Sequence, residues 1–335
     1  MAHPSRPVAC VALPIPEATL HRLREKVDVR QLAPGFDRDE LHAALEGASG
    51  LLCSNLLPID GALFDAAPGL RVVSNFGVGF DNVDVAEASA RGVAICNTPG
   101  VLSEAVADLT MLLILAAARR MLENASFVTG GGWSRGEARP PLGFDLAGKT
   151  LGIVGFGRIG QAVARRALVF GMNVAYQDVL DDPRVGFETC LQCDIEDLLR
   201  RSDVVSLHVN LSPQTHHLIG HEQLEQMKST AWLVNTSRGP VVDQAALVDA
   251  LRRGAIAGAA LDVLEEEPPA LHDPILSLPN VILLPHVGSA TIETRQAMLD
   301  LAVENLLASL DDRMPPACVN PEALGRHEIQ RGGSP

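Results

Sequence analysis

The sequence has no excess of basic charge. Its 27 Lys and Arg residues are outnumbered by 41 Asp and Glu residues, so the formal net charge is −14 at pH 7. An acidic surface repels phosphate backbones and anionic lipid headgroups, which argues against nucleic acid and membranes as partners. An anionic small molecule would therefore have to find positive potential locally.

Long apolar runs and a cationic leader are also missing. The longest apolar stretch, LTMLLILAAA over residues 109–118, is about half the roughly 20 residues that a membrane-spanning helix needs. We expect it to form a buried helix, and a subunit interface is one place where such a helix would be buried. The first residues, MAHPSRPVACVALPIP, lack the pattern of a secretory signal, so we expect a cytoplasmic protein.

Cysteines are few and scattered. Of the six, only Cys190 and Cys193 show a C-x-x-C spacing, and no second pair completes a zinc site. We therefore expect no metal, and the role of this pair stays open. There is no internal repeat.

What the sequence does contain is an alternation of strand-like and helix-like segments, typical of parallel sheets covered by helices. At 335 residues and 47% hydrophobic content, the chain can build two packed domains. A Gly- and Pro-rich loop, residues 129–149, separates a first unit of about a hundred residues from a second. A last helix is predicted over residues 291–310, and the chain from Met314 onward is expected to be loosely ordered. The predicted strands are residues 8–13, 27–32, 50–54, 70–75 and 92–97 in the first unit, and 150–155, 172–178, 202–209, 230–237, 255–263 and 280–286 in the second.

Three spaced glycines follow the first strand of the second unit, in TLGIVGFGRIGQ. Alone, a G-x-G-x-x-G pattern indicates no more than a tight turn, but here it joins an apolar strand to a helix. In a dinucleotide-binding turn, Gly155 permits the sharp bend and Gly157 lets a pyrophosphate approach the backbone. Gly160 allows the helix to pack on the strand, and the helix N-terminus faces the anion.

An acidic residue stands where such a turn needs one. Asp178 ends the next strand, MNVAYQD, about 20 residues further on, and can accept hydrogen bonds from the adenosine ribose. Its charge would repel a 2′-phosphate, and the following VLDDP adds acid rather than arginine. The prediction is therefore NAD(H), with NADH preferred over NADPH.

Three further stretches each place a polar side chain after an apolar strand: LVNTSRGPVVD with Arg238, ALDVLEEEPP with Glu267, and VILLPHVGSAT with His286. Ligands of open α/β sheets bind at the carboxyl ends of strands. With GVGFDNVD, NTPGVLSEAVAD and the glycine turn, these stretches follow one another in an order that resembles the D-isomer-specific 2-hydroxyacid dehydrogenase family over nearly the whole chain. One departure is Asn210, where many relatives carry proline.

The chemistry of reducing a 2-keto acid explains these residue types. His286 would supply the proton to the carbonyl oxygen, because the pKa of histidine lies near 6.5. The resemblance assigns Glu267 to bracing the imidazolium. Arg238 would donate two parallel hydrogen bonds to the substrate carboxylate and polarise the keto carbonyl.

The resemblance also implies binding contacts. Backbone amides of Val78 and Gly79 would hold the substrate carboxylate. Asp262 would meet the nicotinamide carboxamide, and Arg158 and Ile159 would supply backbone near the pyrophosphate. Further cofactor contacts are expected at Thr236, His286 and Gly288.

The fold implied by the resemblance is a Rossmann-type doubly wound sheet plus a flavodoxin-like substrate domain, with the active-site cleft between them. We expect the substrate domain in residues 1–98 and 290–318, the NAD domain in residues 99–289 and a C-terminal tail in residues 319–335. The family usually forms dimers, so a homodimer is expected.

The glyoxylate and hydroxypyruvate reductase branch is the one this chain looks most like. Trp133, Leu56 and Met298 are possible wall residues around the substrate, or simply packing. Oxidation of 3-phosphoglycerate is a rival that would need extra cations, and formate oxidation is disfavoured because relatives with that chemistry carry glutamine at the position of Glu267. A different class, a nucleotide-sensing corepressor, shares the fold, but we identify no peptide-binding surface for it.

Overall fold

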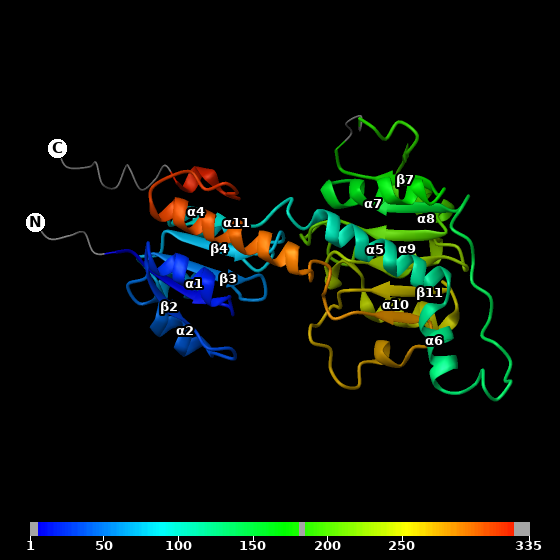
Figure 1. The fold of residues 1–335 in the computed structure, drawn as a ribbon. Helices are drawn as coiled ribbons and strands as arrows, with labels where there is room; N and C mark the ends of the chain where they lie inside the picture. Colours follow the sequence, from blue (N-terminus) through cyan, green and yellow to red (C-terminus); the bar gives the residue numbers. More distant parts are fainter. Residues whose placement is uncertain (1–5, 181–184, 325–335) are drawn as a thin grey trace, which may run out of the picture. The chain divides into compact units, whose positions relative to one another are not determined.

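The computed structural model describes residues 6–180 and 185–324. This part of the chain divides into two compact units, one formed by the residues up to 102 together with those from 291 onward, the other by residues 103–290. The sequence analysis placed the divisions after residues 98 and 289. Each unit is a parallel sheet with helices on both faces (Figure 1), which confirms the predicted α/β class.

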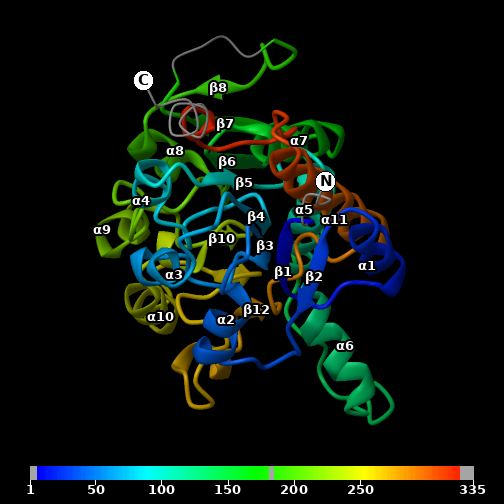
Figure 2. The ribbon, with the colours of Figure 1, turned by 90° about the vertical axis from the view of Figure 1, so that its left-hand side faces the viewer.

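The first unit contains a five-stranded parallel sheet in the order β2-β1-β3-β4-β5, a flavodoxin-like order. Strands β1, β3, β4 and β5 are buried on both faces, whereas the edge strand β2 is largely exposed, so helices must cover both faces of the sheet. Figure 2 shows α1 and α11 on one side of the sheet and α3 and α4 on the other. The elements are β1 (Val8–Ala12), α1 (Glu17–Arg24), β2 (Asp28–Gln31), α2 (Arg38–Leu45), β3 (Gly50–Ser54), α3 (Gly61–Ala66), β4 (Val72–Phe76), α4 (Val85–Ala90), β5 (Ala94–Cys96), α11 (Ile292–Leu310) and η3 (Pro321–Ala323).

Helix α11 comes from the far end of the chain and completes the first unit. It begins where the side chain of Thr291 accepts a hydrogen bond from the N–H of Thr294. Leu299, Val303 and Leu306 are buried against the sheet. The predicted helix over residues 291–310 therefore forms, within one residue of its expected start.

The expectation of a loosely ordered chain from Met314 onward is wrong for residues 317–324. Asn320 is 1% exposed. Its side chain accepts from the N–H of Ile95 at 2.7 Å and donates to the carbonyl of Val93 at 3.0 Å. This buried amide ties the segment to the edge strand β5, a partner that lies more than two hundred residues away. Residues 325–335 of the predicted tail lie outside the described residues.

The second unit contains a seven-stranded parallel sheet in the order β12-β11-β10-β9-β6-β7-β8. Relative to the first strand, β6, this is the Rossmann order with one added strand. Helices α5 and α7 cover one face and α8 and α10 the other. The elements are α5 (Ser103–Ala118), α6 (Met121–Thr129), β6 (Thr150–Val154), α7 (Arg158–Val169), β7 (Asn173–Gln177), β8 (Leu191–Gln192), α8 (Ile195–Arg201), β9 (Val204–Leu207), α9 (His221–Gln226), β10 (Trp232–Asn235), η1 (Gly239–Val241), α10 (Gln244–Arg253), β11 (Gly258–Leu261), η2 (Pro274–Ser277) and β12 (Val281–Leu283).

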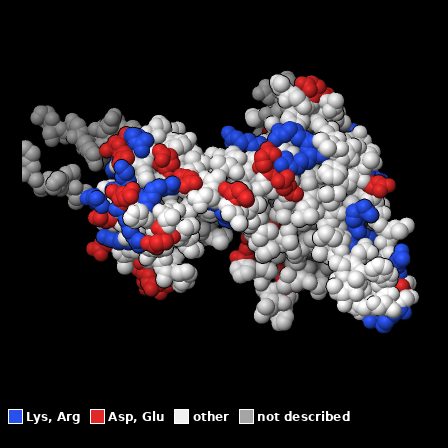
Figure 3. Space-filling model, viewed as in Figure 1, with Lys and Arg blue, Asp and Glu red and all other residues white. Residues whose placement is uncertain are grey.

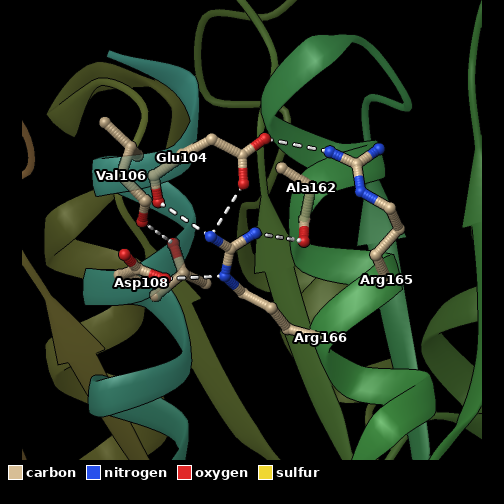
Figure 4. Close-up of polar contacts among 7 residues, drawn as sticks. Glu104, Val106, Asp108, Ala162, Arg165 and Arg166 are labelled. Carbon is tan, nitrogen blue, oxygen red and sulfur yellow. Dashed lines mark hydrogen bonds and ion pairs between the residues drawn. The ribbon is translucent and has the colours of Figure 1, made fainter.

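The loop at residues 129–149 does not divide the units, because α5 already belongs to the second unit. Ion pairs hold α5 against α7: Arg166 bonds Asp108 at 2.7 Å and Glu104 at 2.8 Å (Figure 4). Arg165 pairs with the other oxygen of Glu104 at 3.0 Å. Composition alone pointed to the Gly/Pro-rich loop, whereas the apolar face of α5 decides its place.

No helix of the described residues is long and apolar enough to cross a membrane.

Candidate active site

Three neighbouring strands of the second sheet, β10, β11 and β12, carry the predicted catalytic side chains just beyond their carboxyl ends. Arg238 follows β10, Glu267 follows β11 and His286 follows β12. Parallel neighbours end at the same edge of a sheet, so the three loops emerge side by side. This edge is where α/β sheets bind ligands.

The structure brings His286 and Glu267 together. Nδ1 of His286 lies 2.7 Å from Oε2 of Glu267, and the other carboxylate oxygen accepts from the N–H of Leu264 at 3.0 Å. Both side chains are half-buried, with 33% and 27% of their surfaces exposed. An ionised carboxylate only accepts hydrogen bonds, so Nδ1 is the donor and Nε2 faces away from the pair.

Glu267 is held in its charged form. Burial alone would raise the pKa of this carboxyl, but the hydrogen bond from His286, its positive charge, the Leu264 amide and the charge of Arg238 lower the pKa below its ordinary value. Glu267 is therefore an anion at neutral pH and accepts the hydrogen bond from Nδ1 of His286.

Asp262 fixes the backbone that carries His286. The Asp262 side chain is 1% exposed, and its two oxygens accept from the N–H groups of Val287 at 2.8 Å and Gly288 at 2.7 Å. The N–H of His286 donates to the carbonyl of Asp262 at 2.8 Å, and His286 has a φ of 54°. Burial raises the pKa of Asp262, against the effect of these amides. Asp262 thus holds the His286 loop, a role that the sequence analysis did not assign to it.

Arg238 sits in a turn organised by a buried amide. Asn235, at the end of β10, donates to the carbonyl of Arg238 at 2.8 Å and accepts from the N–H of Ser237 at 3.0 Å. A Cβ on the next residue, Gly239, would lie 1.7 Å from the carbonyl oxygen of Leu264. Only glycine lets the Arg238 turn lie against the Glu267 loop. The sequence analysis missed Asn235 and Gly239, although both lie in the quoted VNTSRG stretch.

The glycine turn after β6 has the geometry of a phosphate-binding turn. Gly155 has a φ of 91°, and a Cβ there would lie 2.6 Å from the carbonyl oxygen of His208. A Cβ on Gly160 would lie 2.2 Å from the carbonyl oxygen of Gly155, so helix and strand touch through this glycine. In contrast, a Cβ on Gly157 would meet nothing within 4 Å. Open space therefore adjoins the N-terminus of α7, where a diphosphate could reach the backbone.

Asp178 is anchored to the same turn. One carboxylate oxygen accepts from the N–H of Phe156 at 2.7 Å and the other from the N–H of Leu180 at 3.0 Å. Its charge is thereby placed beside the glycines, as a ribose-binding acid requires. Asp181 and Asp182, which also entered the cofactor prediction, lie outside the described residues.

Val78 and Gly79 lie in a loop of the first unit, directly after β4. Two asparagine side chains hold its carbonyls: Asn97 donates to Val78 at 2.7 Å and Asn75 to Gly79 at 2.9 Å. Among residues 6–180 and 185–324, no acceptor bonds to the N–H of Val78 or Gly79. The carbonyls of this loop are thus occupied by side chains. Asn75 and Asn97, both buried, were not singled out from the sequence.

The remaining predicted residues are placed as follows. The hydroxyl of Thr236 lies 2.9 Å from that of Thr110 on α5. Arg158 is exposed and Ile159 half-buried, in the first turn of α7. The carbonyl of Asn210 accepts from the hydroxyl of Thr215 at 2.6 Å, which closes its loop. Of the possible wall residues, Leu56 and Trp133 are exposed whereas Met298 is buried within the first unit.

One group of side chains outside the predicted site could be considered for a metal. Ligand atoms of His216, His217 and Glu265 lie within 4.8 Å of one another. However, the two imidazoles are stacked at 4.0 Å with 26° between their planes. Nitrogen lone pairs lie in the ring planes, so nearly parallel rings do not converge on one ion at about 2.0–2.1 Å. Nε2 of His217 instead pairs with Glu265 at 2.7 Å.

The chain is similar to proteins of known family. The family model for the D-isomer specific 2-hydroxyacid dehydrogenase NAD binding domain matches residues 111–288. A glyoxylate reductase of Thermofilum pendens is 46% identical over 98% of both chains. The crystal structure of a glyoxylate reductase from Paecilomyes thermophila covers 95% of this chain and 99% of its own, at 33% identity and a TM-score of 0.87. An NADPH-dependent glyoxylate/hydroxypyruvate reductase from Sinorhizobium meliloti, solved with NADP and malonate, covers 95% of this chain and 98% of its own, at 37% identity and a TM-score of 0.84.

Proposed function

The chain belongs to the D-isomer specific 2-hydroxyacid dehydrogenase family, and from that premise we propose that it reduces glyoxylate or hydroxypyruvate to the D-2-hydroxy acid with NADH. The chain is thus an NAD-dependent oxidoreductase, and the proposal concerns its substrate, its preferred cofactor and its catalytic residues. The observation that carries the proposal is the 2.7 Å contact between His286 and Glu267 at the carboxyl edge of the sheet.

His286 is the proposed general acid. With Nδ1 donating to Glu267, Nε2 is the atom that gives its proton to the substrate carbonyl oxygen. Because Glu267 is charged at neutral pH, it favours the imidazolium before the transfer and orients the ring during it. Asp262, through Val287 and Gly288, keeps the loop in place.

Arg238, Val78 and Gly79 are the proposed anchors of the substrate. The planar guanidinium of Arg238 can take a carboxylate with two parallel hydrogen bonds. The amides of Val78 and Gly79 are themselves proposed to donate to a carboxylate, since Asn97 and Asn75 hold the carbonyls of that loop. Together they supply local positive potential in a chain of net charge −14.

Cofactor binding is proposed at the glycine turn, through Gly155, Gly157, Gly160 and the amides of Arg158 and Ile159. Bound NADH would supply the hydride for the carbonyl carbon. Thr236, Asp262, His286 and Gly288 are the proposed contacts on the nicotinamide side.

The preference for NADH rests on Asp178, whose carboxylate is anchored beside the glycines. The Sinorhizobium relative is described as NADPH-dependent, so similarity to neighbours does not decide the cofactor.

The decisive experiment follows NADH absorbance with glyoxylate, hydroxypyruvate, pyruvate, 3-phosphohydroxypyruvate and a bulky 2-keto acid. We expect the first two to give the highest kcat/KM. The highest kcat/KM with 3-phosphohydroxypyruvate would favour the rival 3-phosphoglycerate reaction instead. Absence of turnover with every acid would favour the corepressor-like scaffold.

A variant tests the proposed acid. His286→Ala should lower kcat by about a hundredfold or more, since a positioned acid contributes that much, while NADH still binds. His272→Ala removes an exposed histidine from a loop of the same unit and should leave kcat unchanged. Near-normal turnover of His286→Ala would remove this residue from the mechanism.

A homodimer is proposed as the assembled form, and a cytoplasmic location stays a prediction. Helix α6 has no buried residue, and Met121, Leu122, Val128 and the following Trp133 are all exposed. Figure 3 shows an uncharged area over this part of the second unit, bordered by Lys and Arg side chains. Light scattering should give twice the 35.6 kDa mass of one chain, and Leu122→Asp should shift it toward the monomer.

A further inference from the structure

The first unit contains two cysteines that the proposed reaction does not use and that face each other across two segments of backbone. Cys96 is the last residue of β5, and Cys318 lies in the segment that follows α11. Their backbones pair as a single antiparallel β-bridge, with no covalent bond between the sulfurs. Both are free thiols.

The hydrogen bonds around the bridge define the type of pair. The N–H of Val319 donates to the carbonyl of Ile95 at 2.7 Å, so the bond joins the residues that flank Cys96 and Cys318 rather than the cysteines themselves. In an antiparallel ladder this is a non-hydrogen-bonded pair, with Cα atoms about 4.5 Å apart and side chains on one face. A disulfide needs a Cα separation of about 4.4–6.8 Å.

Buried amides clamp both ends of this short ladder. Asn320 accepts from the N–H of Ile95 at 2.7 Å. On the other side, Asn305 accepts from the N–H of Ala317 at 2.9 Å and donates to the carbonyl of Asn97 at 2.9 Å. The two strands therefore cannot slide past each other without breaking buried hydrogen bonds, and the thiols stay opposed.

From this juxtaposition we propose that Cys96 and Cys318 form an intramolecular disulfide when the protein meets a hydroperoxide, which makes them an oxidative modification site. Cys318 is only partly buried and within reach of a small oxidant, whereas Cys96 is 0% exposed. Cys318 reacts first and Cys96 resolves the product.

Cys318 is the more acidic of the two thiols, as expected if it reacts first. The neighbouring Cys96 thiol lowers the pKa of Cys318 to about 7, against burial. Contact with Cys318 and burial raise the pKa of Cys96. A thiolate is the reactive form of cysteine, so Cys318 is the nucleophile at neutral pH.

The reaction balances in two steps. The Cys318 sulfur attacks the O–O bond of the hydroperoxide and becomes a sulfenic acid, while the hydroperoxide is reduced to its alcohol, or to water in the case of hydrogen peroxide. The Cys96 sulfur then attacks the Cys318 sulfur, its proton joins the departing hydroxyl, and water leaves. The two thiols together lose two electrons, which the hydroperoxide accepts.

The test uses the full chain treated with hydrogen peroxide, digested without reductant and mapped by mass spectrometry. We expect most molecules to yield the Cys96 peptide linked to the Cys318 peptide, with both thiols protected from alkylation and both released by dithiothreitol. The oxidised protein should also unfold a few degrees higher, because the bond constrains the unfolded chain.

Matched variants separate this pair from the other cysteines. Cys318→Ser should abolish the linked peptides and the thermal shift, whereas Cys190→Ser should retain both. The proposal is overturned if Cys96 still alkylates fully after Cys318 has been oxidised, or if the only link found joins Cys190 to Cys193. The mapping of the unsubstituted chain decides this even if a variant folds poorly.

Discussion

Two turns of this molecule, each proposed to bind an anion, orient their backbone amides in different ways. After β6 of the second unit, glycines lead directly into the twelve-residue helix α7, whose N-terminus faces open space at Gly157. After β4 of the first unit, the chain enters a loop instead, and Asn75 and Asn97 hold its carbonyls so that its amides are left for a ligand. An acidic protein can therefore build local positive potential from backbone, either with a helix or with buried asparagines.

Among the changes that test this comparison, the largest expected effect comes from altering the glycine turn. In Gly155→Ala, the new Cβ would meet the carbonyl of His208 at 2.6 Å, in a backbone conformation that disfavours alanine. We expect the Kd for NADH, measured by fluorescence titration, to rise about 30-fold or more. Gly254→Ala is the matched control, since Gly254 also has positive φ but meets nothing within 4 Å. An equal loss of affinity in both variants would contradict a special role for the turn.

The loop of the first unit should respond differently. Asn97→Ala removes the bond to the carbonyl of Val78, so the amide that should bind the carboxylate loses its orientation. We expect KM for the keto acid to rise about tenfold, with the Kd for NADH unchanged. Asn280→Ala removes a comparable bond to a backbone carbonyl in the second unit and should leave KM for the keto acid unchanged. A change in NADH affinity alone would mean that the two turns do not have separate ligands.

Asp178 is proposed to determine whether the cofactor site prefers NADH or NADPH. Asp178→Asn keeps an acceptor for the N–H of Phe156 but removes the charge that would repel a 2′-phosphate. The ratio of kcat/KM with NADPH to that with NADH should rise about tenfold. Glu196→Gln, which removes an exposed charge from α8, should leave the ratio unchanged. A native enzyme that already prefers NADPH would refute the assignment.

The smallest effect concerns pH and the packing behind the glycine turn. Burial lowers the pKa of His208 from 6.5 to about 3, and its Nε2 lies 2.8 Å from the hydroxyl of Ser206. The unfolded chain takes up a proton near pH 6.5 and the folded chain does not, so this residue lowers stability as pH falls from 6.5 toward 3. In His208→Asn, the loss of thermal stability between pH 7 and about pH 5 should be smaller than in the native protein. An identical pH dependence in both proteins would contradict the buried, neutral state of His208.

Much of the fold could be predicted because local pattern and burial agree. The predicted strands form in both sheets, since continuous apolar runs suit strands buried on two faces. Composition alone misplaced α5, because the core residues that its apolar face packs against and its ion-pair partners Arg165 and Arg166 are distant in the chain. The ordered segment around Asn320 was missed for the same reason, since its partners lie in β5.

In the candidate site, too, some residues could be predicted from the sequence and others could not. The types and order of Arg238, Glu267 and His286 can be read along the chain, because each follows an apolar strand and strands of a parallel sheet end at one edge. The supporting residues Asn235, Gly239, Asn75 and Asn97 could not be predicted, because a buried amide or a close backbone approach is defined only by what lies opposite.

By itself the sequence determined which segments become strands, where the chain bends at glycine and which side chains can move a proton, because these depend on neighbours along the chain. Only the tertiary structure decided that Asp262 holds the loop of His286, that Gly239 lies against Leu264 and that Cys318 faces Cys96. Those contacts join residues far apart in the chain, and hydrogen bonds and steric exclusion act only once packing has brought the partners within reach.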